Sequence, residues 1–169
     1  MKYKIIIFSV LMGLFNGFGF AQNAIDKAIE KYNSNSVEYI SVPELASLMQ
    51  KNKDFKLLDT RAVSEYEVSH LKDAIYVGYK EFDLESIQDK IKPDDTIIMY
   101  CSFGVRSEQI GEQLQEAGYK KVYNLYGGLF EWFNQGNEIF NLQNQQTDSI
   151  HAYNNKWGQF IKGGTKVYE

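Results

Sequence analysis

The sequence predicts an α/β domain in which a mostly parallel sheet is covered by helices on both faces. Short apolar runs typical of strands alternate along the chain with segments of helical periodicity, which indicates βαβ units and a parallel sheet. The most strand-like run, "DTIIMYC" at residues 95–101, is apolar and rich in β-branched residues, as expected for a buried strand. The length of 169 residues is enough for one domain with a real core but hardly for two.

The expected elements follow one another in a regular order. Strands are expected in "VEYI", "FKLLDT", "AIYVG", "DTIIMYC" and "KKVYNLYGG", at residues 37–40, 55–60, 74–78, 95–101 and 120–128. Helices are expected at residues 23–35, 41–50, 63–69, 82–91 and 106–117, and around Trp132. The helix at 41–50 has a clear start, because Ser41 and Glu44 can form a capping box flanked by the apolar pair Ile40 and Leu45.

The C-terminal region, residues 141–169, differs in character from the rest. It begins with the polar run "NLQNQQTD", which predicts a linker. Four apolar residues then recur at helical spacing, at positions 153, 157, 160 and 161 (Tyr153, Trp157, Phe160 and Ile161). This pattern predicts a C-terminal amphipathic helix packed on the domain; a docking face for a partner is the alternative.

The first 21 residues have the pattern of a secretory signal peptide. Two lysines precede an apolar run, and small residues follow, so cleavage is expected after Ala21. The alternative is a membrane anchor, but residues 5–21 are short for a membrane span. We therefore expect a periplasmic or secreted protein with no stable membrane insertion after cleavage. The domain proper is expected at residues 22–140.

Composition and charge exclude several classes of function. Removal of Lys2 and Lys4 would leave 16 basic and 22 acidic residues, a net charge of −6, which argues against nucleic acid or an anionic membrane as partner. One cysteine and the two distant histidines, His70 and His151, do not form a metal-binding pattern. No metal site and no cofactor are therefore expected.

Cys101 is the single cysteine of the chain and the main candidate for chemistry. An unpaired thiol in an exported protein is buried, intermolecular or reactive. Cys101 stands at the carboxyl end of the expected buried strand, where ligands bind in parallel sheets. The short loop that follows must curl at Gly104, so that backbone N–H groups, the start of a helix and Arg106 surround the sulfur. Such a cradle lowers the pKa of a thiol and favours an anionic substrate.

The segment "CSFGVRS" at residues 101–107 resembles the active-site loop of rhodanese-like sulfurtransferases. Two other segments extend the resemblance in the same order. "LLDTRAVSEYEVSHLKDAIYV" is similar to the family's Asp-x-Arg, Glu-aromatic and His-Ile-x-x-Ala segment, and "YKKVYNLYGGLFEW" to its strand, Gly-Gly turn and tryptophan. The resemblance runs from about Val37 to Ile139 and implies the three-layer rhodanese-like fold.

The resemblance also implies roles for individual residues. The Cys101 thiolate would take a sulfur atom from a donor and become a persulfide, which the loop amides would stabilise. Arg106 would hold the anion that leaves the donor. The loop residues expected to bind the substrate are Ser102, Phe103, Gly104, Val105, Arg106 and Ser107. Asp59 and Arg61 are expected to form a structural ion pair near the site, and His70 is expected to be structural; a catalytic role for any of these three is the alternative.

The implied activity is that of an exported thiosulfate:cyanide sulfurtransferase of the rhodanese type. Four residues separate Cys101 from Arg106, one fewer than in phosphatases that share the fold, which favours sulfur over phosphate. The donor is thiosulfate or a persulfide, and the acceptor is cyanide or a thiol. We expect a monomer. The alternative is a non-enzymatic module that carries sulfur or binds a partner protein.

Overall fold

A five-stranded parallel sheet forms the centre of the protein. The computed structural model describes residues 16–168. The strands are arranged in the order β1-β5-β4-β2-β3, and every neighbouring pair is parallel. Their bounds are Glu38–Ile40 (β1), Lys56–Asp59 (β2), Ile75–Tyr76 (β3), Thr96–Tyr100 (β4) and Lys121–Leu125 (β5). Because β4 lies in the middle, the chain that leaves its carboxyl end starts at the centre of the sheet edge.

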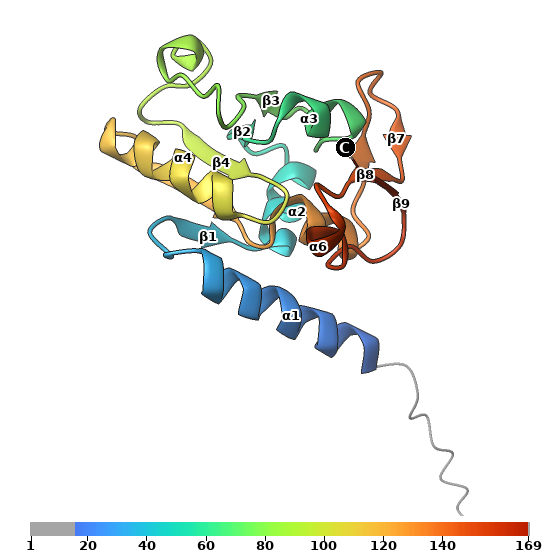
Figure 1. The fold of residues 1–169 in the computed structure, drawn as a ribbon. Coiled ribbons are helices and arrows are strands. Elements are labelled where there is room, and N and C mark those ends of the chain that lie inside the picture. Colours follow the sequence, from blue (N-terminus) through green and yellow to red (C-terminus); the bar gives the residue numbers. More distant parts are fainter. Residues whose placement is uncertain (1–15, 169) are drawn as a thin grey trace, which may run out of the picture.

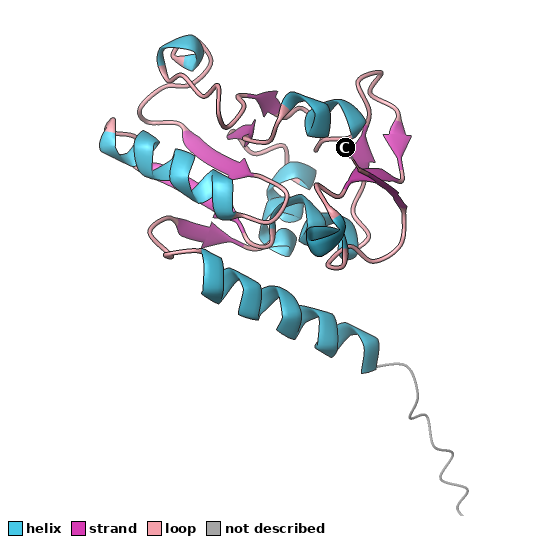
Figure 2. Cartoon of the chain, in the orientation of Figure 1, coloured by secondary structure: helices cyan, strands magenta, loops and turns pink. Residues whose placement is uncertain are grey.

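Helices cover both faces of this sheet, as predicted (Figures 1 and 2). Five of them are Asn16–Tyr32 (α1), Val42–Gln50 (α2), Val63–Val68 (α3), Val105–Glu116 (α4) and Gly128–Asn134 (α5). Helix α2 starts with the predicted capping box: the Glu44 carboxylate accepts from the Ser41 N–H at 2.9 Å. In Figure 1, the yellow helix α4 lies beside β4, and the blue helix α1 runs along the other side of the molecule.

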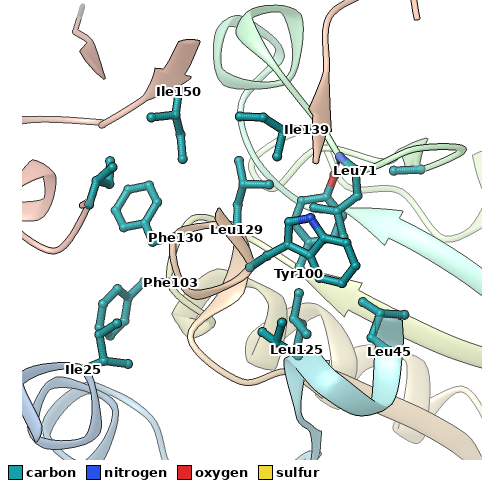
Figure 3. Packing of buried hydrophobic residues seen from close by; sticks show 14 of the residues in the cluster. Ile25, Leu45, Leu71, Tyr100, Phe103, Leu125, Leu129, Phe130, Ile139 and Ile150 are labelled. Atoms are coloured by element: carbon teal, nitrogen blue, oxygen red, sulfur yellow. Dashed lines mark hydrogen bonds between the residues drawn. The ribbon is translucent and has the colours of Figure 1, made fainter. Parts of the chain in front are cut away.

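The residues of β4 alternate between two buried clusters. Ile98 and Tyr100 belong to one cluster, together with apolar residues of α1, α2 and α5 (Figure 3). Ile97 and Met99 belong to the other, together with apolar residues of α4. This alternation is the strand period of two. A strand buried on both faces has little freedom to move, so the residues that follow β4 start from a fixed point.

Segment 82–91 is mostly not helical, contrary to the prediction. Only Glu85–Ile87 forms a short 3₁₀ turn (η1). The Asp83 carboxylate accepts from the Glu85 N–H at 3.0 Å, and the Ser86 hydroxyl donates to the Asp83 carbonyl at 2.7 Å. Such local side-chain bonds compete with a regular helix. Ile87 and Ile91 of this segment are nevertheless both buried in the second cluster.

The predicted polar linker is paired with the domain. Ile139–Phe140 (β6) and Gln146–Thr147 (β7) form an antiparallel pair around a tight turn. The Asn141 carboxamide closes this turn by accepting backbone N–H bonds from Gln143 and Gln145, each at 3.0 Å. The expected polar linker is thus an ordered turn with a paired strand, which composition did not reveal because side-chain closure of a turn leaves little trace in it.

The predicted C-terminal amphipathic helix is also wrong in extent. It shrinks to a single turn, Asn155–Gly158 (α6), between the parallel strands Ser149–His151 (β8) and Thr165–Val167 (β9). Tyr153 has a φ of +63°, a left-handed conformation that no α-helix contains. The side chain of the next residue, Asn154, then caps α6. The aromatic residues Trp157 and Phe160 still pack against the first cluster.

Most of the predicted signal peptide, residues 1–21, lies outside the described residues. Helix α1 begins at Asn16 and continues past Ala21, the expected cleavage site. Within residues 16–168, no helix combines the length and apolar character that crossing a membrane requires. Cleavage after Ala21 stays a prediction.

Candidate active site

The candidate site is the loop of four residues between β4 and α4, which begins with Cys101. Gly104 closes this loop with a φ of +109°, a conformation that L-amino acids with side chains rarely adopt. The turn brings the Gly104 N–H to 3.0 Å from the Cys101 Sγ. Cys101 is 2% exposed, so its sulfur lies at the bottom of the loop. The curled loop expected from the sequence is therefore present.

The surroundings of Cys101 favour its thiolate. Burial alone would raise the pKa of this thiol. The positive charge of Arg106 and the backbone N–H groups of Ser107, Phe103 and Gly104 outweigh this effect, and the pKa lies below its ordinary value. A lowered pKa makes a cysteine nucleophilic near neutral pH.

The thiolate should be detectable by titration. The chain has a single cysteine but 12 tyrosines, whose phenolates also absorb, so the ultraviolet absorbance of Cys101→Ser is subtracted; the difference reports on Cys101 alone, and we expect a midpoint below that of free cysteine. Arg106→Gln should raise this midpoint by about one pH unit, because the nearest cation is lost. Lys120→Gln, past the far end of α4, should not change it. A midpoint equal to that of free cysteine would contradict this account of the loop.

Arg106 is held by a buried carboxylate that the sequence analysis gave no role. Its Nη1 and Nη2 donate to Glu65 Oε2 and Oε1 at 2.6 and 2.7 Å. The hydroxyl of Ser102 donates to Glu65 Oε1 at 2.6 Å and accepts from Arg106 Nη2 at 3.0 Å. Burial opposes ionisation of Glu65, but hydrogen bonds and charge from Arg106 lower its pKa to about 2. Helix α3 thus fixes the cation next to the sulfur.

A second set of polar contacts holds the other side of the loop. The Ser107 hydroxyl donates to Asn124 Oδ1 at 2.7 Å. The Asn124 amide in turn donates to the Gly104 carbonyl at 2.8 Å, and the Asn33 amide donates to the same carbonyl at 2.9 Å. Ser107 therefore acts on the sulfur through its backbone N–H, while its side chain ties the loop to β5.

The Gly127-Gly128 turn packs directly under the loop. Helix α5 begins there, and two of its backbone N–H groups donate to the loop: Leu129 to the Cys101 carbonyl at 2.9 Å and Phe130 to the Ser102 carbonyl at 3.1 Å. A Cβ atom on Gly128 would lie 2.4 Å from the Cys101 carbonyl oxygen. The turn therefore needs glycine for close approach of two backbones.

Gly128→Ala should destabilise the protein by more than about 2 kcal/mol. The left-handed backbone costs an alanine about 1–2 kcal/mol, and the clash with the loop adds to this. Gly136→Ala is the matched control, since Gly136 also has a positive φ of +78° but has open space around its Cα. Urea unfolding measures both variants. Equal losses for the two would show that the contact with the loop has no energetic weight.

The structure places Asp59, Arg61 and His70 away from the lining of the pocket described below. Arg61 and Asp59 form a fully buried ion pair at 2.7 Å, and the Arg61 guanidinium also donates to the Ser69 carbonyl at 2.5 Å. This is the predicted ion pair, and it ties the end of β2 to the end of α3. The His70 Nδ1 lies 3.0 Å from the Tyr66 carbonyl, and its ring stacks on that of Tyr66.

A pocket of about 190 Å³ opens above Cys101. Ser102, Val105 and Arg106 of the loop region line it, with Arg106 as its only charged lining residue within residues 16–168. The other lining residues are aromatic: Tyr32, Phe103, Phe130, Tyr153 and Trp157. Phe103 is 3% exposed and packs among aromatic rings, which makes it a wall of the pocket.

Sequence reasoning missed three parts of this site. Glu65 belongs to the quoted Glu-aromatic motif, which could have pointed to it. Asn124 had no signal beyond its place near a strand end. Tyr32 was given no role, and Tyr153 and Trp157 were expected on a helix face that packs on the domain or docks a partner, because nothing local tells a packed aromatic residue from one at a pocket mouth.

Comparisons with known proteins identify the family of this domain. The family model "Rhodanese-like domain" matches residues 41–135. Thiosulfate sulfurtransferase GlpE of Coxiella burnetii is 29% identical over 82 residues, which cover 48% of this chain and 75% of the relative. Putative sulfur carrier protein YrkF of Bacillus subtilis is 27% identical over 100 residues, 59% of this chain and 53% of the relative. The chain thus spans about half the length of that relative.

The fold is also found among solved structures. The rhodanese-like domain of the Alr3790 protein from Anabaena matches with a TM-score of 0.57 at 22% identity, over 62% of this chain and 79% of that one. The family match covers more than half of the chain and includes the loop, Glu65 and the Gly127-Gly128 turn. The chain therefore belongs to the rhodanese-like domain family.

Proposed function

We propose that the protein is a sulfurtransferase that moves a sulfur atom from thiosulfate or a persulfide to cyanide or a thiol, through a persulfide on Cys101. The observation that carries this proposal is the loop itself. It surrounds one sulfur atom with backbone N–H groups and a fixed guanidinium, and it leaves that sulfur at the bottom of a pocket. The thiosulfate sulfurtransferase relative supports the reaction class.

The reaction consists of two displacements on sulfur. The Cys101 thiolate attacks the outer sulfur of thiosulfate; the sulfur–sulfur bond breaks, and sulfite leaves with the bonding electron pair. Cyanide or a thiolate then attacks the outer sulfur of the persulfide, and the Cys101 thiolate leaves in turn. The N–H groups that favour the thiolate also favour the persulfide anion. Arg106 is the cation nearest to the leaving sulfite.

Two measurements test the proposal in sequence. After exposure to thiosulfate or polysulfide, the intact mass should rise by one sulfur atom, and a peptide map should place that atom on Cys101. Catalytic release of thiocyanate from thiosulfate and cyanide should then follow. Failure of every donor to load Cys101 would refute the proposal.

A sulfur carrier is the second candidate function. The sulfur-carrier relative favours it. A carrier would load with sulfur and discharge once, without rapid turnover to thiocyanate at a low concentration of the protein. The cyanide assay therefore separates the two functions.

We also propose that the protein is exported to the periplasm or secreted and acts as a monomer. The signal-like pattern of residues 1–21 supports export. The intact mass of protein recovered outside the cytoplasm should correspond to a chain starting near residue 22. Sedimentation should give the mass of one such chain, and a larger particle would exclude the monomer.

A further inference from the structure

The mouth of the Cys101 pocket is built by segments that flank the family match at residues 41–135. Tyr32 ends helix α1, before the match begins, while Tyr153 and Trp157 come from the C-terminal region, after it. In Figure 1, the red C-terminal segment with α6 lies next to the blue helix α1. Segments outside the family match thus contribute three of the five aromatic residues that line the pocket and form an aromatic enclosure.

The enclosure is held together by direct contacts. The rings of Tyr32 and Trp157 lie 5.3 Å apart, and Trp157 is also 5.3 Å from the ring of Phe103 in the loop. The guanidinium carbon of Arg106 lies over the ring of Tyr153, 5.4 Å from its centroid. Each rim residue therefore contacts another rim residue or a residue of the loop. Tyr32 and Tyr153 keep 37% and 45% of their surface exposed, so their rings are available to a ligand.

Beyond Arg106 and the backbone N–H groups of the loop, the pocket offers a small, doubly charged ion such as thiosulfate few polar partners. Arg106 is the only charged lining residue among those described, and both of its terminal nitrogens are already bonded to Glu65. The loss of water from such an ion on entry would therefore be compensated only by the remaining N–H donors of Arg106 and by the loop amides. An apolar group, in contrast, is favoured in this pocket, because most of the lining residues are aromatic and can pack against it.

The volume of the pocket indicates the size of the apolar group that it could hold. Apolar cavities of about 150 Å³ hold a benzene molecule, and this pocket measures about 190 Å³. Cyanide or a single sulfur atom would leave most of it unused. A ring or a short branched alkyl group attached to a sulfur atom would fill it, with that sulfur directed at Cys101.

We propose that the aromatic enclosure binds the apolar body of an organic thiol or its persulfide, and that this body makes such thiols the preferred sulfur partners. The inference rests on the proposed sulfur transfer at Cys101. In one direction, the Cys101 thiolate attacks the outer sulfur of R–S–SH, the sulfur–sulfur bond breaks, and R–S⁻ leaves. In the other, R–S⁻ attacks the outer sulfur of the Cys101 persulfide, and the Cys101 thiolate leaves. Electrons balance in both directions without an external oxidant or reductant.

The test compares two thiols of similar acidity as sulfur acceptors. The full chain is first loaded with polysulfide, and intact mass confirms one added sulfur. Discharge to benzyl mercaptan and to 2-mercaptoethanol is then followed over a range of concentrations. We expect the second-order rate constant for benzyl mercaptan to be at least about tenfold larger, with saturation at low concentration. Loading followed by equal rates would overturn the inference but not the proposed function, whereas no loading would overturn the function itself.

Variants of the rim residues test whether the preference for benzyl mercaptan arises at the mouth of the pocket. Tyr153→Asn suits the left-handed backbone at this position, and Tyr32→Ala removes the ring on the other side of the mouth. Each should reduce the ratio of the two rate constants by about threefold or more. Tyr168→Asn is the matched control, because Tyr168 is 44% exposed and does not line the pocket. It should keep the native ratio. A preference that survives in both rim variants would place the binding site for the thiol elsewhere.

Discussion

Replacing Cys101 by serine should abolish both sulfur loading and sulfur transfer, with a loss of at least about a thousandfold in turnover. A serine hydroxyl stays protonated at neutral pH, even within the cradle of backbone N–H groups, and it forms no persulfide. No other thiol in the chain can substitute for it. Intact mass after exposure to thiosulfate and release of thiocyanate measure the two losses.

The interpretation of that variant requires an intact fold. Serine is smaller than cysteine, and its hydroxyl can still accept from the Gly104 N–H, so we expect thermal unfolding within a few degrees of the native protein. Circular dichroism and a melting curve provide this control. A folded serine variant that still produces thiocyanate would show that the sulfur passes through another group.

Glu65→Ala should have the largest effect on stability, about 3–5 kcal/mol. The change leaves the guanidinium of Arg106 largely buried without its partner, and such unpaired charges are costly. It also removes the acceptor of the Ser102 hydroxyl. Urea unfolding at neutral pH measures the loss. Glu67→Ala, two residues further along the same helix and exposed to solvent, should cost less than about 0.5 kcal/mol.

The same carboxylate should make stability depend on acid. The pKa of Glu65 is lowered to about 2 in the folded protein, against an ordinary value of 4.5. Because the folded pKa is depressed, the stabilisation is fully present above pH 4.5 and is lost as the pH falls towards about 2. Glu65→Gln cannot titrate and should flatten this part of the curve of unfolding free energy against pH. If the loss of stability below pH 4.5 were the same in Glu65→Gln, other carboxylates would be responsible for it.

Local patterns were sufficient to predict the sheet and the reactive loop. The apolar run before Cys101, the glycine at 104 and the helix that follows are all encoded within about twenty consecutive residues. Strand, turn and helix starts of this kind depend on neighbours along the chain. The sulfur and the N–H groups around it could therefore be placed from sequence.

The remaining features depend on contacts between distant segments. Glu65 meets Arg106 across 41 residues, and Tyr32 meets Trp157 across 125. The C-terminal stripe of aromatic residues had the spacing of a helix, yet Tyr153 turns the chain and β8 pairs with β9. The apolar residues of this region could be identified from the sequence, but their spacing did not predict which residues they would contact.

The meeting of α1 with the C-terminal region has a practical consequence for protein engineering. A fragment trimmed to residues 41–135 would retain the nucleophile, its carboxylate brace and the glycine turn, but it would lack the walls contributed by Tyr32, Tyr153 and Trp157. It would also lack strand β1 of the central sheet, and the proposed sulfur transfer at Cys101 would take place in a site open to solvent. Conversely, grafting new terminal sequences onto this scaffold would offer a way to redesign selectivity while leaving the reaction chemistry untouched.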